Sequence, residues 1–208
     1  MQRRYILLVI VAASLAYSAG PAIAASKLTQ EMSDMYAAVE MLPPTASRMT
    51  VCYGFRCRRR MELAFTGKER ATLRNILAKG RRSAASERKA IQRAFVWFDH
   101  RVGKEVGTSR RVARADFRAF DDAHNFDCWD TTRNATSLLL VLQDWGALHH
   151  HTVGNPRDRG NILVGQLPHN TAVIVERKSG TRWVVDMWPT AYGQVPDVMP
   201  LAKWLEEN

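Results

Sequence analysis

The sequence predicts a single domain of mixed α-helical and β-strand structure, on three observations. Apolar residues recur at helical spacing through the middle of the chain, and two apolar strand patterns near its end are joined around Ser179-Gly180, a hairpin signal. Residues 25–208 are also long enough for one domain with a sizeable core, because a chain of roughly 150 residues already buries about two thirds of its unfolded surface.

Residues 1–24 have the pattern of a secretory signal peptide. Arg3 and Arg4 precede an apolar stretch from Tyr5 to Ala16, and Ala22-Ile23-Ala24 fits the small-x-small rule for cleavage. The apolar stretch is too short to span a bilayer, and no later segment approaches the roughly 20 apolar residues of a transmembrane helix. We therefore expect a periplasmic or secreted protein with no transmembrane segment after removal of the leader.

Four elements are predicted upstream of residue 107: an arm over residues 25–58, a short strand over 60–65, and helices over 67–78 and 86–102. Pro43-Pro44 and the scarcity of periodic apolar positions predict that most of the arm is helical or irregular. Thr66 and Ser86 are residue types that cap the amino termini of helices, and Gly80 follows the first helix as a stop.

A polar connection over residues 107–125 leads to a helix over residues 127–145. Leucine, valine and tryptophan side chains give this helix a broad apolar face, and Gly146 stops it, so we expect it to run through the core. Cys128 lies in its first turn, where unpaired amide groups and the helix dipole stabilise a thiolate.

The last part of the chain contains four strand patterns and a short closing helix: strands over residues 148–153, 162–164, 171–176 and 182–188, and a helix over 201–207. Gly154-Asn155-Pro156 is a turn signal between the first two strands. His169 opens the third strand, and Asp186 lies late in the fourth. Because the ends of an antiparallel pair are neighbours, we expect these two side chains to be in contact across the hairpin.

Export affects the interpretation of the three cysteines, since oxidising compartments allow disulfides to persist. Cys52 and Cys57 flank a short segment in which Gly54 permits a tight turn. We predict a disulfide between them, worth on the order of 2 kcal/mol in the chain-entropy account. The alternatives are two buried thiols or a redox pair, although a redox pair usually has Cys-x-x-Cys spacing. The predicted disulfide leaves Cys128 unpaired.

Cys128, His169 and Asp186 supply the three groups that a thiol enzyme needs. A thiol attacks carbonyls well only as a thiolate, so an imidazole must take its proton and a carboxylate must fix the imidazole tautomer. Taken singly, the cysteine fits an inert thiol and the histidine fits a core histidine bonded to a carbonyl. The full set favours a catalytic triad, and the chain is predicted to be a cysteine hydrolase or acyltransferase.

A cysteine that opens a core helix, followed by a histidine and an aspartate on adjacent strands, resembles the transglutaminase-like superfamily of papain-type thiol enzymes. The resemblance covers roughly residues 95–190, and the matching pieces are Asp127-Cys128-Trp129-Asp130, His169 before an apolar strand, and Trp183-Val184-Val185-Asp186. Within the superfamily the chain looks most like bacterial periplasmic transglutaminase-like cysteine peptidases. The resemblance implies an α+β fold with a papain-like core, in which the central cysteine helix packs on an antiparallel sheet.

The resemblance also implies a role for each site residue. Cys128 would be the nucleophile, His169 the general base and then acid, and Asp186 the group that orients the imidazole, with a thioester acyl-enzyme as intermediate. The backbone N–H of the cysteine would be the first oxyanion donor. The second donor in this superfamily is an upstream side chain, for which the candidates are Trp97, His124 and Asn125.

Calcium is the one cofactor that the resemblance raises. Calcium-dependent members carry acidic residues that flank the cysteine, and Asp127 and Asp130 stand at such positions, although Trp129 interrupts the acidic pattern. Two carboxylates supply too few of the six to eight oxygens that calcium needs. In the structural alternative, which we favour, Asp127 caps the helix and Asp130 pairs with Arg133 or Arg114.

The formal net charge of +10 is concentrated in three arginine clusters, at residues 56–60, 81–82 and 110–111. These form either a solvated basic face, the interpretation we favour, or contacts with anionic envelope polymers, membrane surfaces or acidic proteins. We expect no nucleic-acid partner, because no binding motif is present. His149-His150-His151 does not predict a metal site, since consecutive strand residues point to opposite faces. Instead, His149 or His151 is expected to line the cleft beside His169.

Three functions are compatible with these features. The leading hypothesis is an exported cysteine peptidase or amidase that cleaves a protein or peptide. A protein-crosslinking transglutaminase would use the same acyl-enzyme but resolve it with a lysine amine. A non-catalytic envelope-binding module would instead use the basic face.

Overall fold

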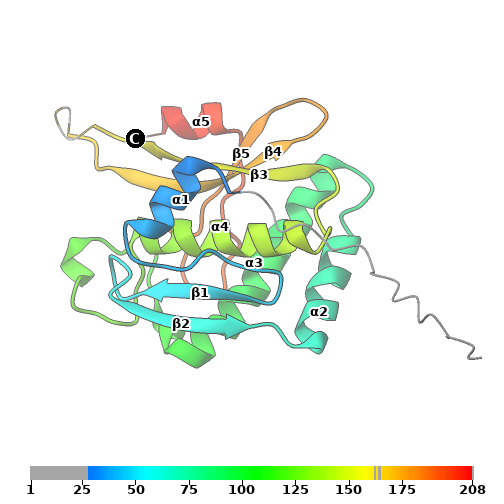
Figure 1. The fold of residues 1–208 in the computed structure, drawn as a ribbon. Helices are drawn as coiled ribbons and strands as arrows, with labels where there is room; N and C mark the ends of the chain where they lie inside the picture. Colours follow the sequence, from blue (N-terminus) through cyan, green and yellow to red (C-terminus); the bar gives the residue numbers. More distant parts are fainter. Residues whose placement is uncertain (1–27, 162, 164, 208) are drawn as a thin grey trace, which may run out of the picture.

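A computed structural model describes residues 28–161, 163 and 165–207, which form a mixed α+β structure (Figure 1). Its helices are α1 (Gln30–Ala37), α2 (Gly67–Ala78), α3 (Ala84–Val106), α4 (Cys128–Asp144) and α5 (Leu201–Glu206). Its strands are β1 (Arg48–Tyr53), β2 (Arg59–Ala64), β3 (His151–Arg159), β4 (His169–Glu176) and β5 (Arg182–Val185). The expected α+β class is therefore confirmed. The expected leader, residues 1–24, lies outside the described residues.

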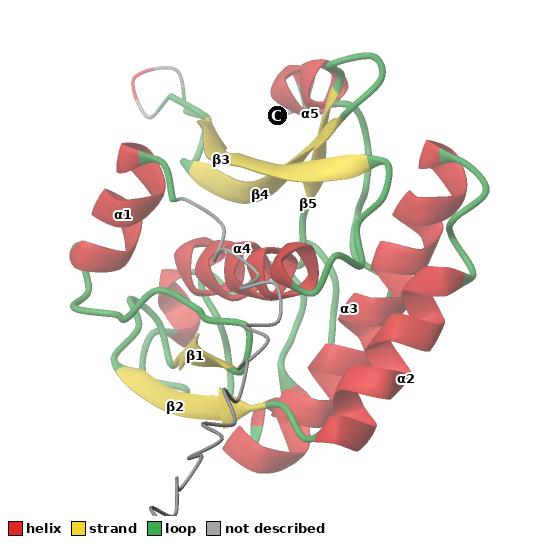
Figure 2. Cartoon of the chain, turned by 45° about the vertical axis from the view of Figure 1, so that its right-hand side comes forward, coloured by secondary structure: helices red, strands yellow, loops and turns green. Residues whose placement is uncertain are grey.

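Helix α4 is the centre of the molecule. Figure 2 shows it between the β1-β2 hairpin on one side and the β3-β4-β5 sheet on the other, with α2 and α3 packed alongside. Every residue from Asp130 to Leu142 is buried. Leu138, Leu139 and Leu142 belong to the main core cluster together with residues of α3 and β4. The prediction of a helix running through the core is confirmed. Because the helix is held by this packing, the position of Cys128 in its first turn is held as well.

Both sheets are antiparallel. β4 pairs with β3 on one edge and with β5 on the other, where Ala172 lies opposite Val185. The predicted hairpin of the last two strands is therefore confirmed. β1 pairs with β2, and Cys52 lies opposite Arg60 in that ladder. Within the part of the chain that the structure describes, no helix is both long enough and apolar enough to cross a membrane.

Two of the elements predicted upstream of residue 107 need correction. The arm contains α1, as expected, but also strand β1, which was not predicted; Met49 and Val51 alternate with more exposed neighbours and supply its buried face. α3 begins at Ala84, and its cap is Ser83 and not Ser86. The Ser83 hydroxyl accepts a hydrogen bond from the backbone amide of Ser86. Thr66 caps α2 as predicted, in a reciprocal capping box with Glu69.

The predicted turn at Gly154-Asn155-Pro156 is also wrong, because β3 runs through it from His151 to Arg159. The ladder with β4 shifts register between Gly154 and Arg157, so the segment forms an irregularity within the strand. A Cβ at Gly154 would lie 2.9 Å from a methyl group of Val175, so the glycine allows close packing against β4. Of the predicted strand at 162–164, only residue 163 is described, and it is not in a strand.

A buried ion pair joins α3 to the connection that follows it, and both partners also bind the segment after β5. Asp99 and Arg111 are each 2% exposed, and the Asp99 carboxylate accepts from Nε and Nη2 of Arg111 at 3.1 and 3.0 Å. Asp99 also accepts from the Gly193 amide at 2.6 Å, and Arg111 donates to the Thr190 carbonyl. The expectation that residues 110–111 form part of a surface cluster is thus wrong for Arg111, whose guanidinium group is buried and paired with Asp99.

Candidate active site

Cys128 is the first residue of α4, and its thiol is partly exposed and unpaired. Asp127 precedes it in extended conformation and caps the helix, with its Oδ1 accepting from the Asp130 amide at 2.7 Å. The predicted capping role of Asp127 is confirmed. Because the helix start directs its free amide groups and the positive end of its dipole toward this position, a negative charge on the sulfur is stabilised there.

His169 and Asp186 meet at the end of the hairpin, as the strand pattern predicted. His169 begins β4, Asp186 directly follows β5, and His169 Nε2 lies 2.6 Å from Asp186 Oδ2. Their exposed fractions are 4% and 1%. A contact this short between two groups shielded from water is the geometry of a carboxylate that orients an imidazole.

The Asp186 carboxylate is itself held by two tryptophans. The indole Nε1 of Trp204, in α5, donates to Oδ2 at 3.0 Å, and the backbone amide of Trp188 donates to Oδ1 at 3.2 Å. The backbone of Asp186 forms a two-way bridge with that of Asp197, with both bonds at 2.9 Å. The carboxylate is thereby fixed in position and satisfied as an acceptor. Neither tryptophan was predicted from the sequence to contact the site.

Aromatic rings also hold the His169 imidazole. Its centroid lies 4.5 Å from that of the Trp188 ring and 5.4 Å from that of the Trp204 ring. Its second nitrogen, Nδ1, is buried and makes no hydrogen bond of ordinary geometry with the described residues. With Nε2 committed to Asp186, Nδ1 is the atom that remains to exchange a proton with the thiol.

Electrostatics couple this imidazole to the cysteine. Burial lowers the pKa of His169, but interactions with Asp186 and with the Cys128 thiol raise it by more, so the net pKa lies above its ordinary value. A second contact comes from the neighbouring residue, Asn170, whose side-chain amide Nδ2 lies 3.5 Å from the sulfur. Cys128, His169 and Asp186 are thus brought together as predicted, and Asn170 adds a donor that sequence reasoning missed.

The three proposed side-chain oxyanion donors do not line the cavity at Cys128. Asn125 uses both ends of its amide elsewhere, accepting from the Val112 amide and donating to Asp122, each at 2.8 Å. His124 Nδ1 also lies 2.8 Å from Asp122. Trp97 packs, partly buried, against the main core. The side chains of Asn125 and His124 therefore form hydrogen bonds within the polar connection. Asn170 is the side-chain donor that contacts the Cys128 sulfur.

The donor set around Asp127 and Asp130 does not fit a calcium ion. Asp127 Oδ2 accepts from the Arg56 amide and Asp130 Oδ1 accepts from the Cys57 amide, both at 2.7 Å. Three of the four carboxylate oxygens therefore accept from backbone amides, and among the described residues only Asp130 Oδ2 has no hydrogen-bond partner. A shell of six to eight oxygens cannot be built from this arrangement.

Asp130 is enclosed rather than ion-paired, so its predicted pairing with Arg133 or Arg114 is wrong. Burial, together with the charge of Asp127, raises its pKa to about 7. The sulfurs of Cys52 and Cys57 lie with an Asp130 oxygen within 4.8 Å of one another, but they form a disulfide and cannot act as thiolate ligands.

The predicted disulfide between Cys52 and Cys57 is confirmed, with the two Cα atoms 4.6 Å apart. It closes a loop in which Gly54, Phe55, Arg56 and Cys57 all have positive φ. Such a run is costly for residues other than glycine, and the crosslink and the amide bonds to Asp127 and Asp130 hold it in place. The loop is therefore attached directly to the first turn of α4.

Beside Cys128 lies a cavity of about 280 Å³, mostly apolar, which we call the Cys128 cavity. The residues that line it are Phe55, Arg56, Ala115, Asp116, Phe117, Phe120, Asp127, Cys128, Leu167, Pro168 and Trp188. Phe117 is 75% exposed and Leu167 is 68% exposed, so part of this apolar surface faces solvent. The connection over residues 107–125, which the sequence showed only as polar, supplies its aromatic wall.

The histidine run lies outside this region. The backbone amides of His149 and His150 donate to Glu87 at 2.5 and 2.8 Å, and His151 Nδ1 lies 2.7 Å from the same buried carboxylate. Burial raises the pKa of Glu87, but these bonds lower it by more, so the net pKa lies below its ordinary value. The expectation that His149 or His151 lines the cleft is wrong, because the run instead ties β3 to α3.

The comparisons with known proteins add no relative to this geometry. No protein-family model, curated protein or solved structure matches the chain.

Proposed function

We propose that this protein is a cysteine peptidase of the transglutaminase-like, papain-type class that hydrolyses a peptide amide bond. The observation that carries the proposal is the imidazole of His169, which is bonded through Nε2 to buried Asp186 while its unpartnered Nδ1 is coupled to the thiol at the start of α4. The finer fold assignment rests on the same features, a cysteine helix that packs against an antiparallel sheet carrying the histidine.

The proposed reaction has two halves. His169 Nδ1 takes the thiol proton, the Cys128 sulfur attacks the amide carbonyl, and the imidazolium then gives that proton to the leaving amine. The resulting thioester is attacked by water, whose proton His169 accepts and returns to the sulfur when the acid departs. The backbone amide of Cys128 and Nδ2 of Asn170 are the donors assigned to the carbonyl oxygen.

The Cys128 cavity supports a polypeptide substrate. Its phenylalanine, leucine and tryptophan side chains offer apolar contact beside the sulfur, and its volume of about 280 Å³ accommodates an apolar side chain next to the reacting carbonyl. Transamidation, in which a lysine amine replaces water, requires the same acyl-enzyme and is the second outcome that the experiment must distinguish.

The test is to incubate the protein with a mixed peptide library and to identify new amino termini by mass spectrometry. We expect cleavage by the native chain and a loss of at least about 10³-fold in the Cys128→Ala variant, because no other group can form the thioester. Circular dichroism checks that the variant is folded. Equal cleavage by both proteins would contradict the proposal, whereas peptides joined to an added lysine ester, without new amino termini, would indicate a transglutaminase.

A further inference from the structure

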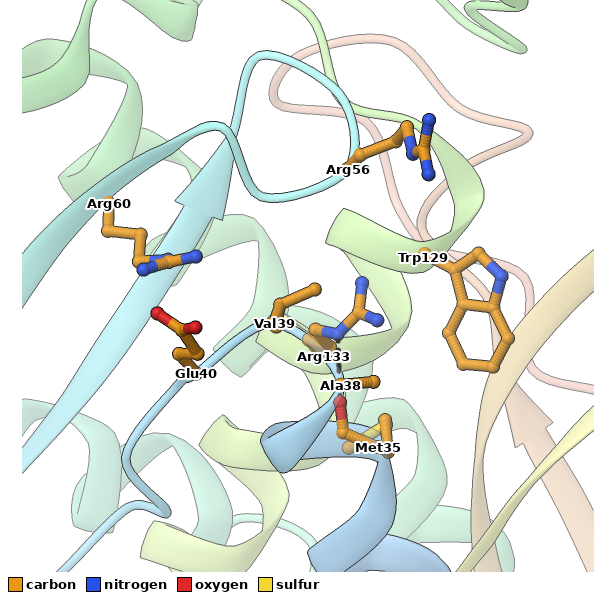
Figure 3. A pocket seen from close by; sticks show the side chains of 8 residues that line it. All are labelled: Met35, Ala38, Val39, Glu40, Arg56, Arg60, Trp129 and Arg133. Carbon is orange, nitrogen blue, oxygen red and sulfur yellow. Dashed lines mark hydrogen bonds between the residues drawn. The ribbon is translucent and has the colours of Figure 1, made fainter.

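A second, larger pocket lies beside the candidate active site. Its volume is about 630 Å³, and we call it the arginine pocket. The residues that line it are Met35, Ala38, Val39, Glu40, Arg56, Arg60, Trp129 and Arg133. Figure 3 shows that they come from the end of α1 and the segment after it, from the β1-β2 hairpin, and from the first turns of α4. Neither the histidine nor the aspartate of the proposed triad lines this space.

Arg133 is the decisive residue of the pocket. It is 5% exposed, and its only hydrogen bond to the described residues runs from Nε to the Met35 carbonyl at 3.2 Å. The rest of its guanidinium group points into the pocket (Figure 3). A buried guanidinium normally requires a carboxylate or several acceptors. Asp127 and Asp130 attract this one through space, but neither forms an ion pair with it.

The other charges of the pocket are also mainly positive. Arg56 and Arg60 line it, and among the described residues neither forms an ion pair. Glu40 is the one carboxylate in the lining; Figure 3 shows it opposite Arg60, yet no ion pair joins them. Three guanidinium groups against one carboxylate leave the pocket with a formal excess of positive charge, which favours an anionic ligand.

The position of the pocket connects it to the candidate nucleophile. Trp129, which directly follows Cys128, forms part of the wall, and the Arg133 guanidinium lies 5.1 Å from its ring. Arg56 lines both this pocket and the Cys128 cavity, and its backbone amide binds the helix cap Asp127. The two cavities therefore share Arg56 and are lined by the consecutive residues Cys128 and Trp129, so a chain bound across the sulfur can contact both.

We propose that the arginine pocket is a subsite for an acidic side chain, glutamate or aspartate, of the peptide substrate, close to its scissile bond. This proposal rests on the proposed peptidase function. Guanidinium groups bind carboxylates through paired N–H donors, and this geometry suits Arg133, whose two terminal nitrogens make no hydrogen bond to the described residues. The apolar walls formed by Met35, Val39 and Trp129 match the methylene groups of such a side chain better than they match an inorganic anion.

Binding is measured first without catalysis, in the Cys128→Ala full chain. The probes are two acetylated, amidated peptides that differ only by glutamate in place of glutamine, and binding is followed by calorimetry at low salt. We expect the glutamate peptide to bind at least about tenfold more tightly. Arg133→Met and, separately, Arg60→Gln should remove most of this difference. Arg60 is exposed, so its variant tests the proposal even where the Arg133 variant fails to fold.

Arg59→Gln is the matched control, because Arg59 is an exposed neighbour in the same strand that does not line the pocket. Equal binding of the two peptides would overturn the subsite. So would inorganic phosphate that competes as strongly as the glutamate peptide, since the pocket would then be a free-anion site. Tighter binding to vesicles containing anionic lipid than to the glutamate peptide, lost in the Arg133 variant, would point to an envelope contact and would overturn it as well.

Cleavage separates failure of the subsite from failure of the proposed function. With the native chain and a mixed library, acidic residues should be enriched at one position near the new termini. Arg133→Met should remove that enrichment, whereas the control Arg59→Gln should keep both the enrichment and the cleavage of neutral peptides. Cleavage without acidic preference would overturn the subsite and leave the peptidase proposal intact. Tight binding of the glutamate peptide without any cleavage would instead contradict the peptidase proposal and support the acidic-peptide site.

Discussion

Replacing Asp186 with asparagine is expected to lower kcat/KM for peptide cleavage by on the order of 10⁴-fold. The carboxylate accepts from His169 Nε2 at 2.6 Å, which leaves Nδ1 without a proton and able to take one from Cys128. An amide at this position can present its NH₂ group to Nε2, which forces the proton onto Nδ1. Initial rates on a cleavable peptide from the library measure the effect, and the loss should appear mainly in kcat.

Asp197→Asn is the matched control for this substitution. Asp197 is hydrogen-bonded to Asp186 only through the backbone among the described residues, and its carboxyl interacts with that of Asp186 through space alone. The substitution preserves the backbone bridge, so activity should stay within a few-fold of the native value. An Asp186→Asn protein that kept more than a tenth of the native activity would show that the carboxylate does not set the histidine tautomer.

Replacing Asp99 with alanine is expected to lower the free energy of unfolding by about 3–5 kcal/mol, because it leaves the Arg111 charge buried without its partner. The Gly193 amide loses its acceptor at the same time. That segment follows Trp188, whose ring lies beside His169, so part of the candidate site depends on this pair. Unfolding in guanidinium chloride, followed by circular dichroism, measures the change as a lower midpoint.

Glu62→Ala provides the comparison for the stability measurement. Glu62 and Arg48 form an ion pair at 3.6 Å in which both side chains are more than half exposed, and such pairs contribute about 0–1 kcal/mol. Similar midpoints for the Asp99 and Glu62 variants would mean that the buried pair is no more important than a surface pair.

The parts of the structure that the sequence predicted are those with local or periodic signals. The apolar face of α4, the Asp127 cap and the Cys52–Cys57 loop are each encoded within a short stretch of chain. The contact of His169 with Asp186 was predictable because a hairpin makes residues at its open end neighbours. Strand β1, in contrast, was not predicted, because the alternation of apolar and polar residues along it is too short to indicate a strand.

The parts that the sequence did not predict depend on contacts between distant elements. Trp204 reaches Asp186 from the last helix, and Glu87 reaches the histidine run from α3, with no spacing that marks either contact. The aromatic wall of the Cys128 cavity comes from Phe117 and Phe120, in a segment whose charged residues dominate its pattern. Asn170 approaches the sulfur from the second position of β4, and no motif in the sequence marks this contact.

In the proposed mechanism Cys128 reacts as a thiolate paired with protonated His169. The most direct measurement is the rate of Cys128 alkylation by iodoacetamide as a function of pH, on non-reduced protein, with mass spectrometry to assign the site and His169→Ala as control. Because the pKa of His169 is raised, the imidazolium persists above its ordinary range and is lost as pH rises through the raised value.

We expect rapid labelling near pH 6 in the native chain, where an ordinary thiol is almost unreactive, and loss of that labelling in His169→Ala. Labelling that begins only above about pH 8, or that occurs only after unfolding, would contradict the account and leave an ordinary or inert thiol. Rapid labelling that persists in the His169→Ala variant would contradict it too, because the histidine would then have no part in activating the sulfur.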